Sequence, residues 1–166
     1  MKSALSAFAL ATIASASIAH AQQAVILVRH AELQGAAMAP AKDLALSEAG
    51  EARASRLADI LRGTGVDAVY VTDFARTAKT AEPLAKAINR EPTVLPKGNA
   101  RELVERLRKD HRDETVLMVG HTDTLPELLK ALGHPAEVKI DAQDYGNLFV
   151  VTPRSAGPPG LVTLRY

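Results

Sequence analysis

Two short runs that are almost wholly apolar, Ala24–Val28 and Thr115–Val119, constrain the fold of this chain more than any other feature. A strand with apolar side chains on both faces must be covered on both faces, as strands in parallel sheets are. Each run is followed along the chain by a segment whose apolar residues have helical spacing. The sequence therefore predicts strands that alternate with helices around a buried sheet.

The other predicted elements continue this alternation. We predict further strands at 66–71, 92–95, 148–152 and 161–166, and helices at about 47–62, 73–89, 99–110 and 124–132. At the start of the last helix, Thr124 and Glu127 have the spacing of a capping box, in which Thr124 accepts the amide of Glu127. Because helical crossovers between parallel strands cover both faces of a sheet, the predicted fold is a three-layer αβα sandwich with a largely parallel central sheet.

The first 21 residues are predicted to be a secretory signal peptide. Lys2 precedes an uncharged run, Ala4–Ala19, and Ala19-His20-Ala21 has the A-x-A form of a cleavage site. A transmembrane helix and a buried helix are the alternatives, but the run is short and rich in Ser and Ala. We therefore expect one domain at 22–166, periplasmic or secreted, with no membrane span after cleavage.

Composition excludes several classes of protein. The chain of 166 residues contains no cysteine, which excludes a disulfide scaffold and a cysteine-ligated zinc site. Its 20 Lys and Arg side chains nearly balance 19 Asp and Glu, so nucleic acid is not an expected partner. With 47% hydrophobic residues the chain is too apolar to remain disordered. These values indicate a globular domain with one hydrophobic core.

Arginine and histidine residues follow three of the predicted strands at their carboxyl ends. Arg29 and His30 follow the first strand, Arg76 lies shortly after the second, and His121 follows the strand at 115–119. Parallel α/β sheets bind ligands beyond these ends. Guanidinium groups match the oxygens of a phosphoryl group, and a neutral imidazole is a competent nucleophile. If the three strands are neighbours, the four side chains form a pocket for a phosphoryl group.

Other roles for these residues remain open at this stage. Arg29 could pair with Glu32 or Asp73. Arg76 could be a solvated helix residue with Asp73 as the helix cap, and His121 could orient the helix that follows it. No His-x-His or His-Glu-x-x-His spacing occurs, and neighbouring arginines repel a cation, so we expect no metal site. Lys42 and Asp43 could line the rim of the pocket, and Asp144, Tyr145 and Asn147 could contribute to substrate specificity. A solvated or structural role is nevertheless expected for these five residues, and also for Glu105, Arg106, Lys109, His111 and His134.

The ordered motifs resemble those of the histidine phosphatase superfamily, which has a phosphoglycerate mutase-like fold. Four segments carry the resemblance: Val28–Glu32 with its Arg-His-Ala sequence, Leu46–Gly50 at the opening of a helix, Asp73–Thr77 around the second arginine, and Val119–His121 around the second histidine. Their order and their places at strand ends make the match specific. The short chain is most similar to the compact phosphohistidine phosphatases of that superfamily.

The resemblance implies a phosphatase that needs no metal and no cofactor. His30 would attack phosphorus to form a phosphohistidine, which water then hydrolyses, while Arg29, Arg76 and His121 would bind the phosphoryl oxygens. The expected substrate is a small phosphorylated molecule or a phosphoprotein that carries a phosphomonoester or a phosphoramidate. The alternative is a protein of the same fold that binds a phosphorylated ligand without turnover.

The general acid of this family has no clear counterpart in the sequence. Related mutases and broad phosphatases usually have a catalytic Glu in an insertion after the second-arginine helix, and this chain is too short there to hold one. Glu102 and Asp123 are the two candidates for the acid. Mutase activity is not expected, because little chain remains to hold an intermediate while it reorients.

Overall fold

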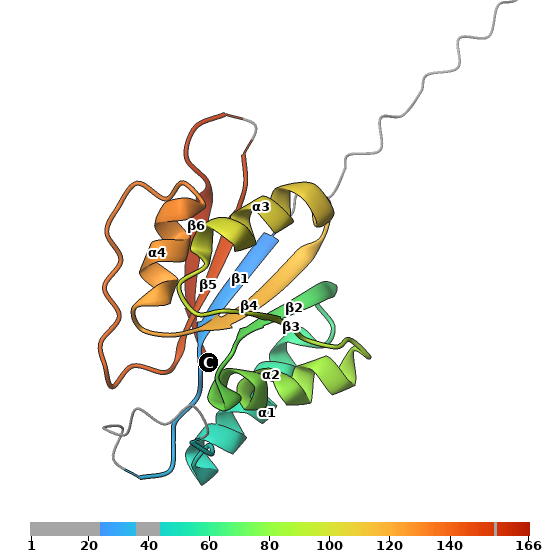
Figure 1. Ribbon diagram of the computed structural model, residues 1–166, viewed down its shortest axis with the longest axis vertical. Coiled ribbons are helices and arrows are strands. Elements are labelled where there is room, and N and C mark those ends of the chain that lie inside the picture. Colours follow the sequence, from blue (N-terminus) through green and yellow to red (C-terminus); the bar gives the residue numbers. More distant parts are fainter. Residues whose placement is uncertain (1–23, 36–43, 155) are drawn as a thin grey trace, which may run out of the picture.

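The computed structural model describes residues 24–35, 44–154 and 156–166, and its elements follow the predicted alternation (Figure 1). The strands are β1 (Ala24–Arg29), β2 (Val66–Thr72), β3 (Thr93–Leu95), β4 (Thr115–Gly120), β5 (Asn147–Thr152) and β6 (Gly160–Arg165). The helices are α1 (Glu48–Leu61), α2 (Ala75–Ala87), α3 (Ala100–Asp110) and α4 (Thr124–Ala131). The predicted signal peptide and the predicted rim residues Lys42 and Asp43 lie outside the described residues.

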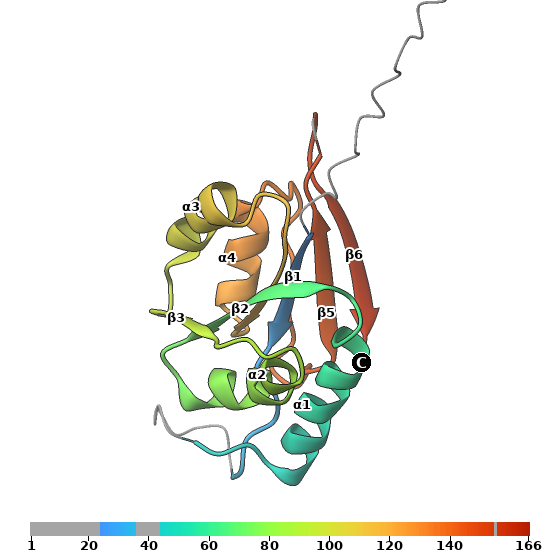
Figure 2. The same cartoon turned by 90° about the vertical axis from the view of Figure 1, so that its right-hand side faces the viewer.

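The six strands form one mixed sheet in the order β3-β2-β4-β1-β5-β6. The first four strands in this order are parallel, while β5 and β6 are antiparallel to their neighbours. Helices α1 and α2 cover one face of the sheet, and α3 and α4 cover the other (Figures 1 and 2). The predicted three-layer αβα architecture with a largely parallel sheet is therefore confirmed.

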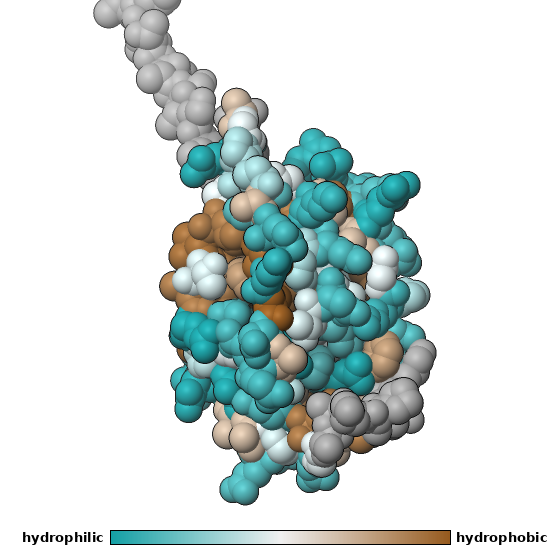
Figure 3. Space-filling view, turned by 90° about the vertical axis from the view of Figure 1, so that its left-hand side faces the viewer, coloured by the Kyte–Doolittle hydropathy of each residue, from teal (hydrophilic) through white to brown (hydrophobic). Residues whose placement is uncertain are grey.

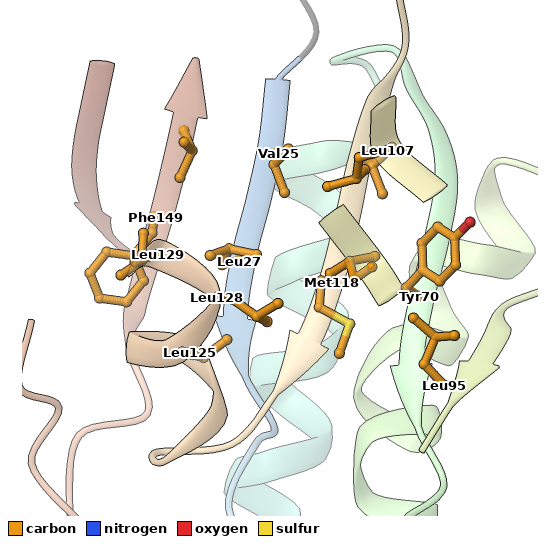
Figure 4. Packing of buried hydrophobic residues seen from close by; sticks show 13 residues of the cluster. Val25, Leu27, Tyr70, Leu95, Leu107, Met118, Leu125, Leu128, Leu129 and Phe149 are labelled. Carbon is orange, nitrogen blue, oxygen red and sulfur yellow. The ribbon is translucent and has the colours of Figure 1, made fainter. Parts of the chain in front are cut away.

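The apolar run in β1 is explained by its position between two hydrophobic cores. Val25 and Leu27 belong to the core under α3 and α4, whereas Ile26 and Val28 belong to the core under α1 and α2. Figure 4 shows the first of these cores, where Leu27 lies between side chains of α4 and of neighbouring strands. Because successive side chains of a strand point to opposite faces, a strand covered on both faces must be apolar throughout.

Helix α1 begins close to the segment that follows β1. The Ser47 hydroxyl accepts a hydrogen bond from the amide of Gly50 at 3.1 Å, which caps the helix. A Cβ at Gly50 would lie 2.2 Å from the carbonyl oxygen of Glu32, so only glycine allows this approach. The close contact fixes the first turn of α1 against the chain two residues after His30.

Two predicted helix starts are wrong in detail. Asp73 and Phe74 precede α2, because Phe74 has an extended backbone and the Asp73 carboxylate accepts the amide of Lys97 at 3.1 Å. The predicted capping box at α4 is also wrong. The amide of Leu125 already donates to the carbonyl of His121, so the turn begins earlier and the Thr124 hydroxyl accepts the His121 amide at 2.8 Å.

The outer strands carry an apolar surface on the side away from α3 and α4. Val162 and Leu164 of β6 are 54% and 50% exposed, and they pair with Val150 and Leu148 of β5. An apolar area is visible in Figure 3 on the side of the molecule that carries these strands.

Within the described ranges, no helix combines the length and the apolar character that crossing a membrane requires.

Candidate active site

The strand order brings the four predicted site residues together. Strand β4 lies between β1 and β2, and Arg29 pairs in register with Gly120, the residue before His121. The ring centroids of His30 and His121 are 5.3 Å apart, and Nη2 of Arg76 lies 3.5 Å from Nδ1 of His121. Arg29 and both histidines are buried. The carboxyl ends of three parallel strands thus bring these four side chains together, and we call this group of side chains the pocket.

His30 is held as a neutral ring with one unprotonated nitrogen. Its Nδ1 lies 2.8 Å from the carbonyl oxygen of Ala31. A carbonyl only accepts, so Nδ1 carries the hydrogen and Nε2 has a free electron pair. Burial, with a smaller contribution from the charges of Arg76 and Arg29, lowers the pKa of His30 to about 4. At neutral pH this imidazole has the protonation state that a nucleophile requires.

Arg29 is fixed by the loop that precedes β5. Its Nη1 donates to the carbonyl oxygens of Ala142 at 2.8 Å and Asp144 at 3.2 Å, and its guanidinium lies 3.9 Å from the ring centroid of Tyr145. Nε of Arg29 is buried and has no hydrogen-bond partner among the described residues. A buried donor without a partner is costly, which is consistent with a ligand oxygen as its acceptor.

The predicted alternative in which Arg29 pairs with Glu32 is wrong. The Glu32 carboxylate instead binds the guanidinium of Arg53, with hydrogen bonds of 2.7 to 2.9 Å. Arg53 also donates to the backbone carbonyl of Tyr166 at 2.8 Å. Glu32 is therefore paired with Arg53 of α1 and not with Arg29, so the charge of Arg29 is available to the pocket.

Arg76 lies at the pocket and not in solvent. Its guanidinium carbon is 4.2 Å from the ring centroid of Phe74, whose ring in turn lies edge-on to His121 at 5.1 Å. Nε of Arg76 is buried and without a partner in the described part of the chain, as Nε of Arg29 is. Two guanidinium groups with unused donors point to an anion with several acceptor oxygens.

His121 is also neutral, and its surroundings differ from those of His30. Burial is the largest cause that lowers its pKa to about 3, and the charges of His30, Arg76 and Lys97 act in the same direction. Its Nε2 lies 2.8 Å from the hydroxyl oxygen of Thr72. The ring therefore has a side-chain partner where His30 has a backbone carbonyl.

Neither candidate general acid is a free carboxyl group. The Glu102 carboxylate accepts from Arg106 at 2.8 Å and from Asn99 at 2.6 Å. Asp123 forms an ion pair with Lys97, whose Nζ is 2.7 Å away. Partial burial acts to raise the pKa of Asp123, but the hydrogen bond and charge of Lys97 outweigh it, so that this pKa lies below its usual value. Asp123 is accordingly ionised at neutral pH.

Two residues near the site, Tyr145 and Thr80, make contacts that the sequence did not predict. Tyr145 lies against Arg29 and edge-on to His30 at 6.0 Å, although a structural turn was the predicted role. Thr80 accepts the amide of Ala31 at 2.9 Å and donates to the Arg76 carbonyl at 2.7 Å. Thr72, Thr77 and Thr80 lie close to Arg76 in the sequence, and this proximity could have marked them as candidate site residues. No local signal marks Tyr145, because it follows the site residues by a long stretch of chain.

His111 and His134 are half-buried, so the prediction that they face solvent is wrong. Nε2 of His111 lies 2.7 Å from the hydroxyl oxygen of Tyr70, and its Nδ1 lies 2.5 Å from the carboxylate of Glu114. Across the described residues, no group of three or more His, Asp and Glu side chains is arranged to hold a metal ion.

Comparisons with known proteins agree with the resemblance seen in the sequence. Residues 25–99 match the sequence model of the histidine phosphatase superfamily (branch 1). No curated protein sequence matches the chain.

Solved structures include close matches of fold. The candidate phosphohistidine phosphatase SixA from Agrobacterium tumefaciens is 22% identical with a TM-score of 0.66, over 86% of this chain and 98% of that chain. The protein histidine phosphatase SixA complexed with tungstate is 20% identical with a TM-score of 0.69, over 86% of this chain and 96% of that chain. A mycobacterial glucosyl-3-phosphoglycerate phosphatase is 15% identical with a TM-score of 0.66, over 88% of this chain and 98% of that chain. The family match and these folds confirm the predicted resemblance.

Proposed function

We propose that this member of the histidine phosphatase superfamily hydrolyses a phosphomonoester or a phosphoramidate through a phosphohistidine at His30. One observation carries the proposal: the unprotonated Nε2 of a neutral His30 shares a pocket with two arginines whose buried Nε groups have no partner among the described residues. Nucleophile and anion-binding donors are thus present together. A site that only bound phosphate would not need the nucleophile.

The reaction has two steps. In the first, Nε2 of His30 attacks phosphorus, the bond to the leaving group breaks with its electron pair, and a proton neutralises the leaving atom. In the second, water attacks phosphorus, the phosphorus–nitrogen bond breaks, and inorganic phosphate departs. Arg29 and Arg76 stabilise the charge on the transferring oxygens in both steps, which is the main task of a protein in phosphoryl transfer.

The surroundings of the candidate acids favour leaving groups that need little help from a carboxylic acid. Asp123 is ion-paired with Lys97, and Glu102 is bound by Arg106. A phosphoramidate nitrogen is more basic than an ester oxygen, so it acquires its proton more easily. We therefore propose phosphoramidates, including phosphohistidine in a protein, as the better substrates. The structural neighbours described as phosphohistidine phosphatases are compatible with this preference.

We further propose that the enzyme needs no metal and acts as a hydrolase without mutase activity. Two guanidinium groups beside the histidines disfavour a cation in the pocket. The connection from α2 to β3 spans only residues 88–92, which supports a site without the insertion of the mutases.

The decisive experiment measures turnover and covalent labelling together. The protein is incubated with p-nitrophenyl phosphate or with phosphoramidate, with a chelator present, and acid-labile phosphoprotein is trapped in alkali. We expect phosphate release that persists with chelator, disappears in His30→Ala, and falls on the order of a thousandfold in Arg76→Ala. His134→Ala, at a histidine outside the pocket, serves as the matched control. Phosphate binding without release or labelling, for both substrates, would establish the non-catalytic alternative.

Export is the second part of the proposal. The leader with its Ala19-His20-Ala21 triplet supports periplasmic location or secretion. Cell fractionation of a C-terminally tagged chain tests it. We expect a mature protein that begins at Gln22 outside the cytoplasm, and a longer, retained form when Ala21 is replaced by a bulky residue. If both the wild-type chain and the Ala21 variant are found at full length in the cytoplasm, export is contradicted.

A further inference from the structure

Two threonine hydroxyls connect His121 to the backbone behind the pocket. Oγ1 of Thr72 lies 2.8 Å from Nε2 of His121 and 3.0 Å from Oγ1 of Thr77. Oγ1 of Thr77 in turn lies 2.8 Å from the carbonyl oxygen of Phe74 and 3.0 Å from that of Thr72. Both threonines are buried, at 2% and 0% exposure, so water does not replace these contacts. We call Thr72 and Thr77 the hydroxyl relay.

The direction of each hydrogen bond in the relay follows from counting hydrogens. The Thr77 hydroxyl has one hydrogen, and two carbonyl oxygens that can only accept surround it. Its hydrogen therefore goes to a carbonyl, and its oxygen must accept from Thr72. The hydrogen of Thr72 is thereby used, so the Thr72 oxygen accepts from His121. Nε2 of His121 consequently carries the ring hydrogen.

The other ring nitrogen of His121 is then bare, and it faces the pocket. Nδ1 lies 3.5 Å from Nη2 of Arg76, a group that can only donate. A hydrogen on Nδ1 would place two donors against each other, so this contact independently favours the same tautomer. The two histidines are thus held in opposite tautomers: the Ala31 carbonyl fixes the hydrogen of His30 on Nδ1, whereas the relay fixes that of His121 on Nε2.

We propose that the hydroxyl relay of Thr72 and Thr77 is a positioning device that locks His121 in the Nε2–H tautomer and keeps an unprotonated Nδ1 toward the phosphoryl pocket. What the pocket binds rests on the proposed function, but the tautomer rests on the contacts alone. In the structure Nδ1 accepts from Arg76. When a phosphoryl dianion binds, Nδ1 takes up a proton from solvent and becomes a donor to a phosphoryl oxygen.

The charged groups around His121 fit this change of role. Arg76 and Lys97 face the ring from α2 and from the chain after β3, and they oppose a proton on it, as His30 directly after β1 would if it were protonated, while Asp123 favours one. A bound dianion outweighs the repulsion of the cations. Proton uptake is therefore coupled to the arrival of the ligand.

The test observes the tautomer directly. Long-range ¹H–¹⁵N correlation spectra at pH 7 distinguish the protonated and the bare nitrogen of each histidine, and the His121 signals are those lost in His121→Asn. In the wild-type protein we expect Nε2–H at His121 and Nδ1–H at His30. An Nδ1–H pattern at His121 would overturn the proposal, whatever the activity of the protein.

Variants of the relay separate positioning from folding. Thr72→Val removes the acceptor of the Nε2–H group, so we expect the His121 proton to shift to Nδ1. A second proton on Nε2 then has no buried partner, so the ring donates to the phosphoryl group only as a neutral imidazole, and we expect kcat/KM to fall about 10- to 100-fold. Thr72→Ser keeps the hydroxyl and should restore both the tautomer and most of the activity. Thr163→Val, at an exposed position of β6, is the matched control. The His30 pattern should be unchanged in every folded variant.

Two further outcomes keep this inference distinct from the proposed function. If wild-type spectra show the expected tautomer, the shift in Thr72→Val occurs, and no substrate is turned over, the relay stands and the proposed catalysis fails. If the enzyme is active but Thr72→Val leaves the His121 pattern and kcat/KM unchanged, the relay is not the device that sets the tautomer. Should Thr72→Val not fold, Thr77→Val gives the same test, because it frees the Thr72 hydrogen to donate to Nε2.

Discussion

At the scale of single residues, burial sets the protonation of the site. His30 and His121 are both almost fully covered, and burial is the largest cause that lowers their pKa values. The arginines add to this effect through their charge. His30, the proposed nucleophile, is therefore already unprotonated at pH values where an exposed histidine would carry a proton.

The lowered pKa of His30 predicts the acid limb of the pH–rate profile. kcat/KM reports the free enzyme, in which His30 must be neutral, so we expect it to fall only as pH drops toward about 4, the pKa of His30, and not near the usual histidine value of 6.5. A phosphoramidate is unsuitable for this profile because its phosphorus–nitrogen bond hydrolyses spontaneously in acid, so an aryl phosphate is measured and its rates are corrected for its own ionisation. A limb near pH 6.5 would show that burial does not control the nucleophile.

A second residue-scale prediction concerns Asp123. Because Lys97 keeps this carboxylate ionised, we expect Asp123→Asn to leave kcat within about threefold of wild type, whereas loss of a general acid costs 10²- to 10⁴-fold. The kcat of an ester with a poor leaving group is the appropriate measurement. Glu127→Gln, in helix α4 directly after Asp123, is the control. A large loss that is confined to poor leaving groups would identify Asp123 as the acid.

At the scale of elements, the site depends on how closely α1 approaches the chain after β1. Gly50 lies against the carbonyl oxygen of Glu32, and Arg53 one turn later binds the Glu32 side chain. The first turns of α1 thus hold the segment that carries His30, because they contact both the backbone and the side chain of Glu32. Helical propensity does not explain a glycine here, but the contact between the two elements does.

We therefore predict opposite effects for two glycine-to-alanine substitutions near the ends of α1. Gly50→Ala places a Cβ 2.2 Å from backbone, which should lower the free energy of unfolding by about 1–3 kcal/mol and displace the His30 segment. Gly63→Ala meets nothing within 4 Å, and should be neutral or slightly stabilising. Urea unfolding of both variants compares them. Equal stability of the two would contradict the close approach.

At the scale of the whole molecule, the pocket lowers stability in acid. The unfolded chain binds protons at His30 and His121 near pH 6.5, while the folded chain resists them until about pH 4 and pH 3. Between these values the unfolded state holds more protons, so the free energy of unfolding rises with pH and falls as pH is lowered. The neutral state of these two histidines is thus linked to the stability of the fold.

Measurement of Tm from pH 7 to pH 4 checks this linkage. We expect the wild type to lose stability across the window, with a slope of at most about 1.4 kcal/mol per pH unit for each histidine. In His121→Asn one of the two contributions is absent, so the slope should be shallower, even though the variant also loses the contact with Thr72. Parallel curves for the two proteins would mean that His121 does not titrate differently in the folded state.

The fold and the four central site residues could be predicted because their signals are local. Apolar runs such as Ala24–Val28 indicate strands covered on both faces, and the helical spacing between them indicates crossovers. Arg29, His30, Arg76 and His121 stand directly at or just after strand ends, where parallel sheets bind ligands.

The errors have a local and a long-range cause. The capping box at Thr124 failed because the turn already starts at His121, whereas His111 is half-buried because it contacts Tyr70 of the distant strand β2. No sequence pattern reveals that Tyr145 supports Arg29. Such contacts depend on how the helices, strands and loops pack against one another, and the local periodicity of the sequence does not determine this packing.

The sequence by itself thus determined which segments become buried strands, which become helices, and which residues end the strands, since these depend on side-chain size, polarity and period. Only the tertiary structure decided that β4 lies between β1 and β2, and hence that three strand ends form one pocket. It also decided the state of both histidines, because burial, the Ala31 carbonyl and the hydroxyl of Thr72 act on them only once the chain is packed.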